Sequence, residues 1–183
     1  MDDCVEIPLL RRRYRDVFGA TLAPAFATYM HRGDGAEHGA ALGYKRAGKD
    51  PLFLEVYLDE PIERLVSREF GCAVERNSIV EIGNFAADNA LAMVELWGAA
   101  ANDLGSGCEV AVATLTAPLR RMFARIGLPF HELAAADPAR LGASATAWGS
   151  YYELAPKVCA GRIAAGQHAL TAFLQRRQRA VAA

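Results

Sequence analysis

Apolar and polar positions alternate along this chain in two periods, which predict strands and helices in turn. Five short apolar runs, bounded by turn residues, are predicted strands: 40–46, 52–58, 78–87, 109–115 and 130–134. Five segments carry apolar residues at helical spacing: 9–30 (with Pro24 interrupting or ending it), 59–70, 89–105, 118–126 and 162–181. Strand–helix–strand order predicts an α/β fold, in which helices pack on a central sheet.

Capping residues mark where several of these helices begin and end. Asp59 or Glu60 is placed to cap the second helix, and Gly71 to close it. Asp88 or Asn89 is placed to cap the third. These residues favour helices as the elements that separate the strands.

A glutamate stands inside the strand predicted over 78–87. Its neighbours Val80, Ile82 and Phe85 are core-forming types, so Glu81 is expected among interior residues. A buried carboxylate must be paired, hydrogen-bonded or protonated, and desolvation raises its pKa toward neutrality, where it can accept a proton. Glu81 is therefore a candidate general base. A glutamate on the wet face of an edge strand, or one paired with an arginine, would give the same sequence.

Composition bounds the class of protein. With 183 residues, 52% hydrophobic and 22% charged, the chain is expected to form one globular domain over 1–183, ending in an amphipathic helix at about 162–181. A net charge of −1 gives no overall attraction to nucleic acid. The arginines cluster, however, and such clusters are solvated helix faces or docking sites for acidic partners: 11–13 with 15, 120–121 with 125, and 176–177 with 179.

Cysteine and histidine spacing predicts neither a metal site nor a redox motif. The four cysteines and four histidines are scattered: Cys4, Cys72, Cys108, Cys159, His31, His38, His131 and His168. No apolar run is long enough for a membrane span, and no secretion signal is visible at the start. We expect a cytoplasmic protein with free thiols.

A segment rich in aromatic residues follows the predicted strands. Trp148, Tyr151 and Tyr152 lie within six residues and can line a ligand pocket. The same residues would also suit a strand with one wet face.

Five separated motifs together resemble the thermostable hemolysin family. They span most of the chain: Tyr14-Arg15-x-x-Phe18, Leu42-Gly43-Tyr44, the stretch from Leu52 to Glu63, Val80-Glu81-Ile82-Gly83-Asn84-Phe85-Ala86, and Trp148-Gly149-Ser150-Tyr151-Tyr152-Glu153 continuing to Gly161. The resemblance implies a GNAT-like N-acyltransferase fold, with a central mixed sheet flanked by helices, related in layout to the acyl-homoserine-lactone synthases. In those synthases a strand carries a Glu-hydrophobic-Ser-Arg-Phe signature, whose glutamate is proposed to deprotonate the amine acceptor. Glu81 matches that glutamate, while Gly83 and Asn84 replace Ser and Arg, so acceptor choice need not carry over.

Two departures from the GNAT pattern bear on the donor. Residues 86–90 lack the glycine-rich loop that holds the coenzyme A pyrophosphate, and Asp88 would repel a phosphate. Phe123 stands where the resemblance implies a proton-donating tyrosine. Both favour a donor held by its pantetheine arm and acyl chain, such as acyl carrier protein, with no tightly bound cofactor. Carrier proteins are acidic, which makes Arg15, Arg120 and Arg121 candidate docking residues.

The resulting hypothesis is transfer of a fatty acyl group from an acyl-carrier-protein or acyl-CoA thioester to a small amine or amino acid. Glu81 would take the proton, Asn84 would orient the base or acceptor, and Tyr152 would replace the missing proton donor. Backbone N–H groups of Phe85 and Ala86 would hold pantetheine or the oxyanion. The acceptor pocket would be shaped by Trp148 and Tyr151.

Three other functions remain compatible with the sequence. The family name suggests a membrane-active, hemolysin-like protein. A non-catalytic acyl-binding module would need the same pocket without turnover. An O-acyltransferase or thioesterase would use an alcohol or water, with Glu81 in a structural role. The sequence does not distinguish a monomer from a dimer.

Overall fold

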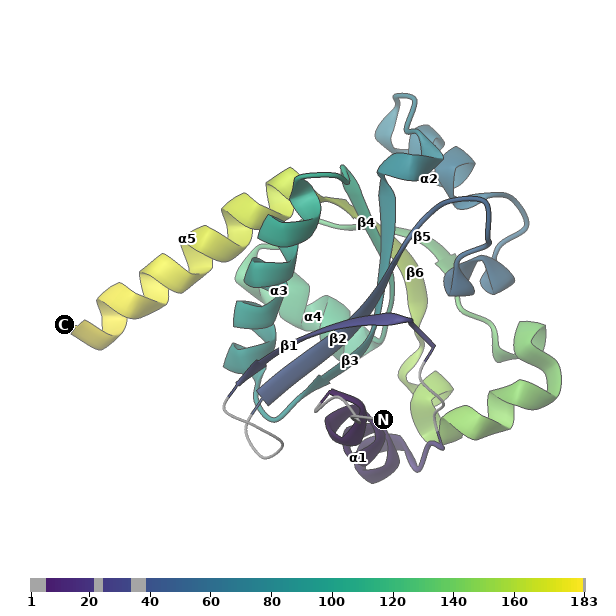
Figure 1. Ribbon diagram of the computed structural model, residues 1–183, viewed down its shortest axis with the longest axis horizontal. Helices are drawn as coiled ribbons and strands as arrows, with labels where there is room; N and C mark the ends of the chain where they lie inside the picture. Colours follow the sequence, from purple (N-terminus) through teal and green to yellow (C-terminus); the bar gives the residue numbers. More distant parts are fainter. Residues whose placement is uncertain (1–5, 22–24, 34–38, 183) are drawn as a thin grey trace.

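A six-stranded mixed sheet forms the centre of the protein. The computed structural model describes residues 6–21, 25–33 and 39–182 (Figure 1), so Cys4, Pro24 and His38 lie outside the described residues. In sheet order, the strands are β1 (Thr28–Gly33), β2 (Gly39–Arg46), β3 (Ile79–Ala87), β4 (Val110–Leu115), β6 (Lys157–Arg162) and β5 (His131–Ala135). Only the β3–β4 pair is parallel; the other neighbouring strands are antiparallel.

Helices cover both faces of the sheet. On one face, α3 (Ala90–Gly105), α4 (Ala117–Ile126) and α5 (Ile163–Ala182) pack on the largest hydrophobic cluster. On the other face lie α1 (Glu6–Phe18), the 3₁₀ turn η1 (Phe53–Tyr57) and α2 (Ile62–Phe70). Two further 3₁₀ segments are η2 (Arg76–Ser78) and η3 (Pro138–Leu154). Among the described residues, no helix is long and apolar enough to cross a membrane.

Strands β3 and β4 stay paired over only three residues. Their parallel ladder runs from Ile79 with Val110 to Glu81 with Val112, and no pairing continues beyond it. Strand β3 also carries a bulge: Gly43 pairs with Gly83 and Ala41 with Ala86, so two residues of β3, Asn84 and Phe85, lie opposite one residue of β2, Leu42. The sheet therefore opens at its centre, directly after the glutamate.

The structure confirms the predicted fold class and most elements. The central mixed sheet flanked by helices is present, and the strands over 40–46, 78–87, 109–115 and 130–134 match β2, β3, β4 and β5 within one residue at every end. The predicted helices α2, α3 and α4 and the C-terminal helix are also present. Asn89 is the cap of α3, since its side chain accepts a hydrogen bond from the N–H of Ala92 at 2.9 Å.

Three sequence predictions are wrong, and one strand was not predicted. The first helix ends at Phe18, before the left-handed Gly19, and residues 28–33 form the edge strand β1 instead of continuing it. Residues 53–57 form a 3₁₀ turn and not a strand. Strand β6 lies in a region for which the sequence predicted neither a helix nor a strand. Neither Asp59 nor Glu60 caps α2: Pro61 takes that position, and the N–H of Ile62 donates to Glu55 at 3.1 Å.

Candidate active site

Glu81 is buried in the sheet, and two backbone groups hold its carboxylate. The solvent exposure of Glu81 is 3%. The N–H of Phe53 donates to Oε2 at 2.7 Å, and the N–H of Leu54 donates to Oε1 at 3.0 Å. Burial raises the pKa of Glu81 to about 7, although these two hydrogen bonds and nearby Lys45 act in the opposite direction. A carboxyl group with this pKa exchanges protons readily at neutral pH.

The two donors are free for Glu81 because η1 is a turn and not a strand. Glu55 Oε2 accepts a hydrogen bond from the N–H of Leu52, the residue before the turn, at 2.7 Å. This bond ties the turn to the segment that precedes it. Arg76 in turn fixes Glu55, with Nη1 and Nη2 at 2.7 and 2.8 Å from its two oxygens. It also reaches Glu63 and the carbonyl of Gly48. The hydrogen bond from Arg76 is the main reason that the pKa of Glu55 falls to about 2. Arg76 therefore positions the turn that holds the base.

Replacing Arg76 by alanine is expected to lower the free energy of unfolding by about 1.5–3 kcal/mol, because it leaves the half-buried Glu55 without its charged partner. The folded pKa of Glu55 is depressed, so this stabilisation is present above about pH 4.5 and is lost as pH falls toward 2. Urea unfolding at pH 7 and pH 3 measures it, and the difference between Arg76→Ala and wild type should shrink at pH 3.

Arg68→Ala is the matched control for this prediction. Arg68 pairs with Glu60 at 2.7 Å on the surface of α2, where its side chain is 64% exposed. An exposed pair contributes at most about 1 kcal/mol. Equal losses in the two variants would show that Arg76 is an ordinary surface arginine.

Aromatic side chains enclose the free side of Glu81. The pocket has a volume of about 30 Å³, room for about one water-sized group. Its lining comes from α1, β3, β4, η1, η3 and the segment before β1: Tyr14, Ala25, Phe26, Phe53, Tyr57, Glu81, Ile82, Gly83, Asn84, Phe85, Thr114, Trp148 and Tyr151. Five predicted site residues thus meet in one place: Glu81, Asn84, Phe85, Trp148 and Tyr151.

The η3 segment is fixed to the end of α1, which places its aromatic residues. Gly149 has φ +55°, a conformation that glycine adopts without strain, and a Cβ built on it would lie 2.0 Å from the carbonyl oxygen of Phe18. Beside it, the N–H of Thr21 donates to the carbonyl of Ala147 at 2.8 Å. This close backbone approach turns Trp148 and Tyr151 toward the sheet.

Tyr152 reaches the site through a second tyrosine. Its hydroxyl lies 2.6 Å from that of Tyr57, which lines the pocket. Burial and the bond to Tyr152 raise the pKa of Tyr57, and the charge of Glu81 adds to the shift. The Tyr57 phenol therefore keeps its proton at neutral pH.

Asn84 occupies the bulge of β3. It has φ +51°, which asparagine tolerates better than most residues, and its Nδ2 donates to the Tyr29 hydroxyl at 3.0 Å. The side chain is thus directed at Tyr29, and the backbone of Asn84 and Phe85 falls outside the β2–β3 register. The bulge and the end of the β3–β4 ladder coincide on this stretch of backbone.

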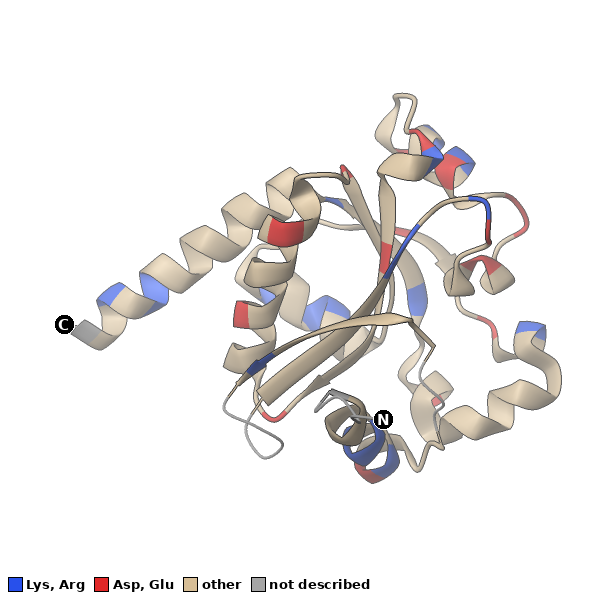
Figure 2. Ribbon diagram, viewed as in Figure 1, with Lys and Arg blue, Asp and Glu red and all other residues tan. Residues whose placement is uncertain are grey.

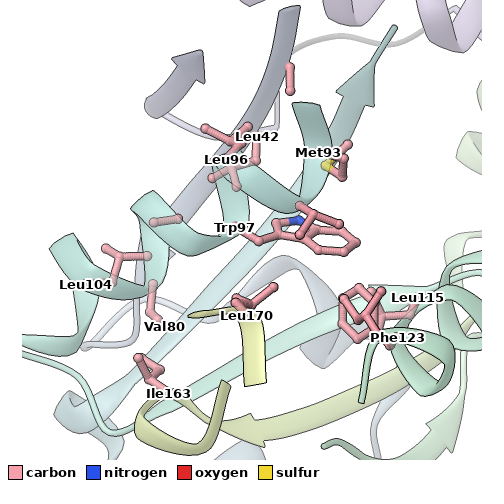
Figure 3. Packing of buried hydrophobic residues seen from close by; sticks show 14 of the residues in the cluster. Leu42, Val80, Met93, Leu96, Trp97, Leu104, Leu115, Phe123, Ile163 and Leu170 are labelled. Carbon is pink, nitrogen blue, oxygen red and sulfur yellow. The ribbon is translucent and has the colours of Figure 1, made fainter. Parts of the chain in front are cut away.

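An apolar cavity of about 100 Å³ lies behind the pocket, between the sheet and α3, α4 and α5. Ile82 and Phe85 line both spaces, so the two adjoin. Trp97, Phe123 and Leu170 converge on this side of the sheet (Figure 3), and the ring centroids of Trp97 and Phe123 are 4.4 Å apart. Cys159 also lines the cavity, and burial raises the pKa of its thiol to about 12, so it remains neutral.

Each of the two spaces has one buried polar side-chain atom without a hydrogen-bond partner. Within the described ranges these are Thr114 Oγ1, from a residue lining the glutamate pocket, and Trp97 Nε1, from a residue lining the apolar cavity. Buried polar groups are nearly always satisfied. Both atoms are enclosed by protein, and each is unsatisfied among the described residues.

Four predicted residues lie away from the pocket lining. Ala86 packs against α1, and Arg15 lies on the outer surface of α1 beside Asp16. Arg121 is exposed on α4. Arg120 is largely buried, donates to the carbonyls of Leu115 and Ala155, and pairs with Glu132. Figure 2 shows basic residues on α1, on α4 and near the end of α5.

Two functional features were missed by the sequence analysis. Tyr57 stands in one of the motifs that carry the family resemblance, and its place in that motif was a usable signal. The amide donors of Phe53 and Leu54 left no signal, because any residue except proline supplies an N–H.

The splayed sheet and the β3 bulge, with the glutamate beside them, agree with the predicted GNAT-like fold. Residues 6–167 match the sequence profile of the family described as thermostable hemolysin, and the chain belongs to this family. No curated protein matches it in sequence.

Solved structures share the fold at low sequence identity. The apo form of TofI is 17% identical, with a TM-score of 0.61 over 93% of this chain and 91% of TofI. FeeM, described as an N-acyl amino acid synthase from uncultured soil microbes, is 14% identical, with a TM-score of 0.54 over 87% of this chain and 89% of FeeM.

Proposed function

We propose that this protein is an N-acyltransferase, which moves a fatty acyl group from an acyl-carrier-protein or acyl-CoA thioester to a small amine or amino-acid acceptor. The observation that carries the proposal is the junction of two pockets at the splayed strands. One holds a carboxyl group with a pKa of about 7, and the other is an apolar cavity suited to an acyl chain. The likeness in fold to FeeM supports the same class of reaction.

Glu81 takes one proton from the incoming ammonium, and the neutral nitrogen then attacks the thioester carbonyl carbon. A C–N bond forms, the carbonyl becomes an oxyanion, and backbone N–H groups near Phe85 stabilise it. As the carbonyl re-forms, the C–S bond breaks and the second proton of the nitrogen passes to the sulfur. The hydroxyl pair of Tyr57 and Tyr152 would relay that proton.

The donor would enter between β3 and β4, with its acyl chain among Trp97, Phe123 and Leu170. Exposed arginines, Arg15 and Arg121 among them, give an acidic carrier protein a surface to dock on. In this proposal the Arg120 guanidinium supports the end of β4.

The test is thiol release from a panel of acyl-carrier-protein and acyl-CoA thioesters, with and without pooled amino acids and polyamines. Release that depends on the amine is the expected result. Release without any amine would identify a thioesterase and overturn the proposal. Tight thioester binding without release would identify an acyl-binding module, and leakage of phospholipid vesicles without thioester would identify a membrane-active protein.

A further inference from the structure

Two glycines lie side by side in the sheet, next to Glu81. Gly83 is two residues beyond Glu81 on β3, so their side-chain positions share a face of the strand, and Gly43 of β2 is the direct partner of Gly83 in the ladder. Neither glycine has a positive φ, so the backbone does not require glycine at these positions. A glycine inside a strand often marks a place where another group approaches closely.

The ring of Phe26 is the group that approaches. A Cβ built on Gly43 would lie 2.6–2.9 Å from Cδ2, Cγ and Cβ of Phe26, and one built on Gly83 would lie 2.8–2.9 Å from Cζ and Cε2 of the same ring. The ring therefore spans both glycines and takes the place of two missing side chains. The solvent exposure of Phe26 is 8%.

Tyr29 ties the backbone of Phe26 to the bulge of β3. The Tyr29 hydroxyl accepts hydrogen bonds from the N–H of Phe26 at 3.3 Å and from Nδ2 of Asn84 at 3.0 Å. The rings of Phe26 and Tyr29 also meet edge to face, with their centroids 6.4 Å apart. Phe26 is thus held through its backbone as well as through its ring.

The Phe26 ring borders the pocket of Glu81 and leaves little space in it. Phe26, Gly83 and Glu81 all line this pocket of about 30 Å³, which holds about one water-sized group. An ammonium group is of that size. A branch on the carbon next to the nitrogen needs additional space, and Phe26 fills the vacant side-chain positions next to Glu81 on this face of the sheet.

We propose that Phe26 selects the acceptor by size, so that only primary amines with an unbranched carbon next to the nitrogen reach Glu81. This inference deepens the proposed function and rests on it for taking an amine as the acceptor. The substrate class is R–CH₂–NH₃⁺, which includes glycine and polyamines. Amino acids that carry a side chain on the α carbon are excluded.

The first experiment compares two amines that differ by one methyl group on that carbon, ethylamine and isopropylamine, with the thioester that wild type turns over fastest. A methyl group that a tight site must accommodate changes kcat/KM by about 10- to 200-fold, and wild type should favour ethylamine by a factor in this range. Phe26→Ala should lose most of the preference. Phe26→Leu should lie between the two, and it replaces the alanine variant if that variant does not fold.

The second experiment measures binding and needs no turnover. In Phe26→Ala, the phenyl group of benzylamine takes the place of the lost ring while its ammonium faces Glu81, which is ionised at pH 8. Calorimetry at that pH, without any thioester, should show benzylamine binding at least about tenfold more tightly to Phe26→Ala than to wild type. Adding Glu81→Gln to Phe26→Ala should remove most of this gain, because the ammonium then has no charged partner.

Phe123→Ala is the matched control for the binding experiment. The solvent exposure of Phe123 is 9%, close to that of Phe26, but its ring lines the apolar cavity between the sheet and α3, α4 and α5. Its removal leaves a space of similar size, and no carboxylate is present among the described residues that line this cavity. Benzylamine should therefore bind to Phe123→Ala no more tightly than to wild type.

The outcomes separate this inference from the proposed function. A folded Phe26 variant that keeps the ethylamine preference of wild type would overturn the inference, and so would benzylamine binding that Phe26→Ala does not strengthen. If benzylamine binds more tightly to Phe26→Ala but no protein releases thiol with any amine, Phe26 limits what reaches Glu81 and the acyltransferase is refuted.

Discussion

Replacement of Glu81 by glutamine is expected to lower amine-dependent thiol release by about 10²- to 10⁴-fold, the usual contribution of a general base. Glutamine has almost the same shape, but it cannot accept a proton from the ammonium. Only its oxygen can accept the hydrogen bonds that Phe53 and Leu54 donate to the carboxylate. The measurement is kcat/KM for the donor and acceptor pair that wild type turns over fastest.

The pH profile gives a second readout of the same residue. In wild type, kcat/KM should rise with pH through an apparent pKa near 7, because Glu81 acts as a base only when ionised. This pKa lies above the ordinary value, so ionisation of Glu81 lowers the free energy of unfolding as pH rises from about 4.5 to 7. In the glutamine variant, kcat/KM should not rise with pH through 7. Its free energy of unfolding should also lack the decrease between pH 4.5 and 7 that ionisation of Glu81 causes.

Glu153→Gln is the matched control, since Glu153 is exposed and lies two residues from Tyr151. It should keep the activity and the pH profile of wild type. If Glu81→Gln folds, keeps full turnover and shows the same rise of kcat/KM with pH as wild type, Glu81 is not the general base and has a structural role.

Replacement of Gly149 by alanine is expected to lower the free energy of unfolding by about 3–5 kcal/mol, among the larger single-residue effects. The new Cβ would fall 2.0 Å from the Phe18 carbonyl oxygen, and alanine disfavours φ +55°. Because a backbone atom cannot move aside as a side chain can, the end of α1 and η3 must separate. Trp148 and Tyr151 then leave the pocket, so activity should fall as well.

Gly142 provides an unusually close control. It lies in the same segment with φ 55° and ψ −132°, against φ 55° and ψ −130° at Gly149, but a Cβ built on it has no atom within 4 Å. Gly142→Ala should therefore show only the conformational penalty, about 1–3 kcal/mol. Urea unfolding followed by tryptophan fluorescence measures both. Equal losses of unfolding free energy in Gly149→Ala and Gly142→Ala would show that the contact with Phe18 does not affect stability.

The position of the base was visible in the sequence because it depends on a local pattern. An acidic residue between Val80 and Ile82 in a strand-forming run is unusual enough to attract attention. Its partners were not visible, since Phe53 and Leu54 are 27–28 residues away and act through their backbone. The same residues were assigned to a strand, because an apolar run does not show that Glu55 bends back to the N–H of Leu52.

The two missed strands have opposite causes. Strand β1 is an edge strand with mostly exposed side chains, so it lacks the apolar alternation that marks a strand. Strand β6 lies inside the sheet and is built around Cys159, Ala160 and Gly161, whose small side chains give no strong propensity. The apolar cavity could not be predicted at all, because it is a gap between the sheet and α3, α4 and α5 that depends on how distant segments pack.

The three-residue ladder between β3 and β4 has a consequence for solubility. A strand edge with unsatisfied backbone groups is a template for aggregation, and proteins usually guard such edges at the rim of a sheet. Here the rim strands carry charged or polar residues, Arg32 on β1 and Glu132 on β5, while the open edges face each other inside the molecule. The protein thus keeps two strand edges available to an extended ligand without offering them to a neighbouring sheet.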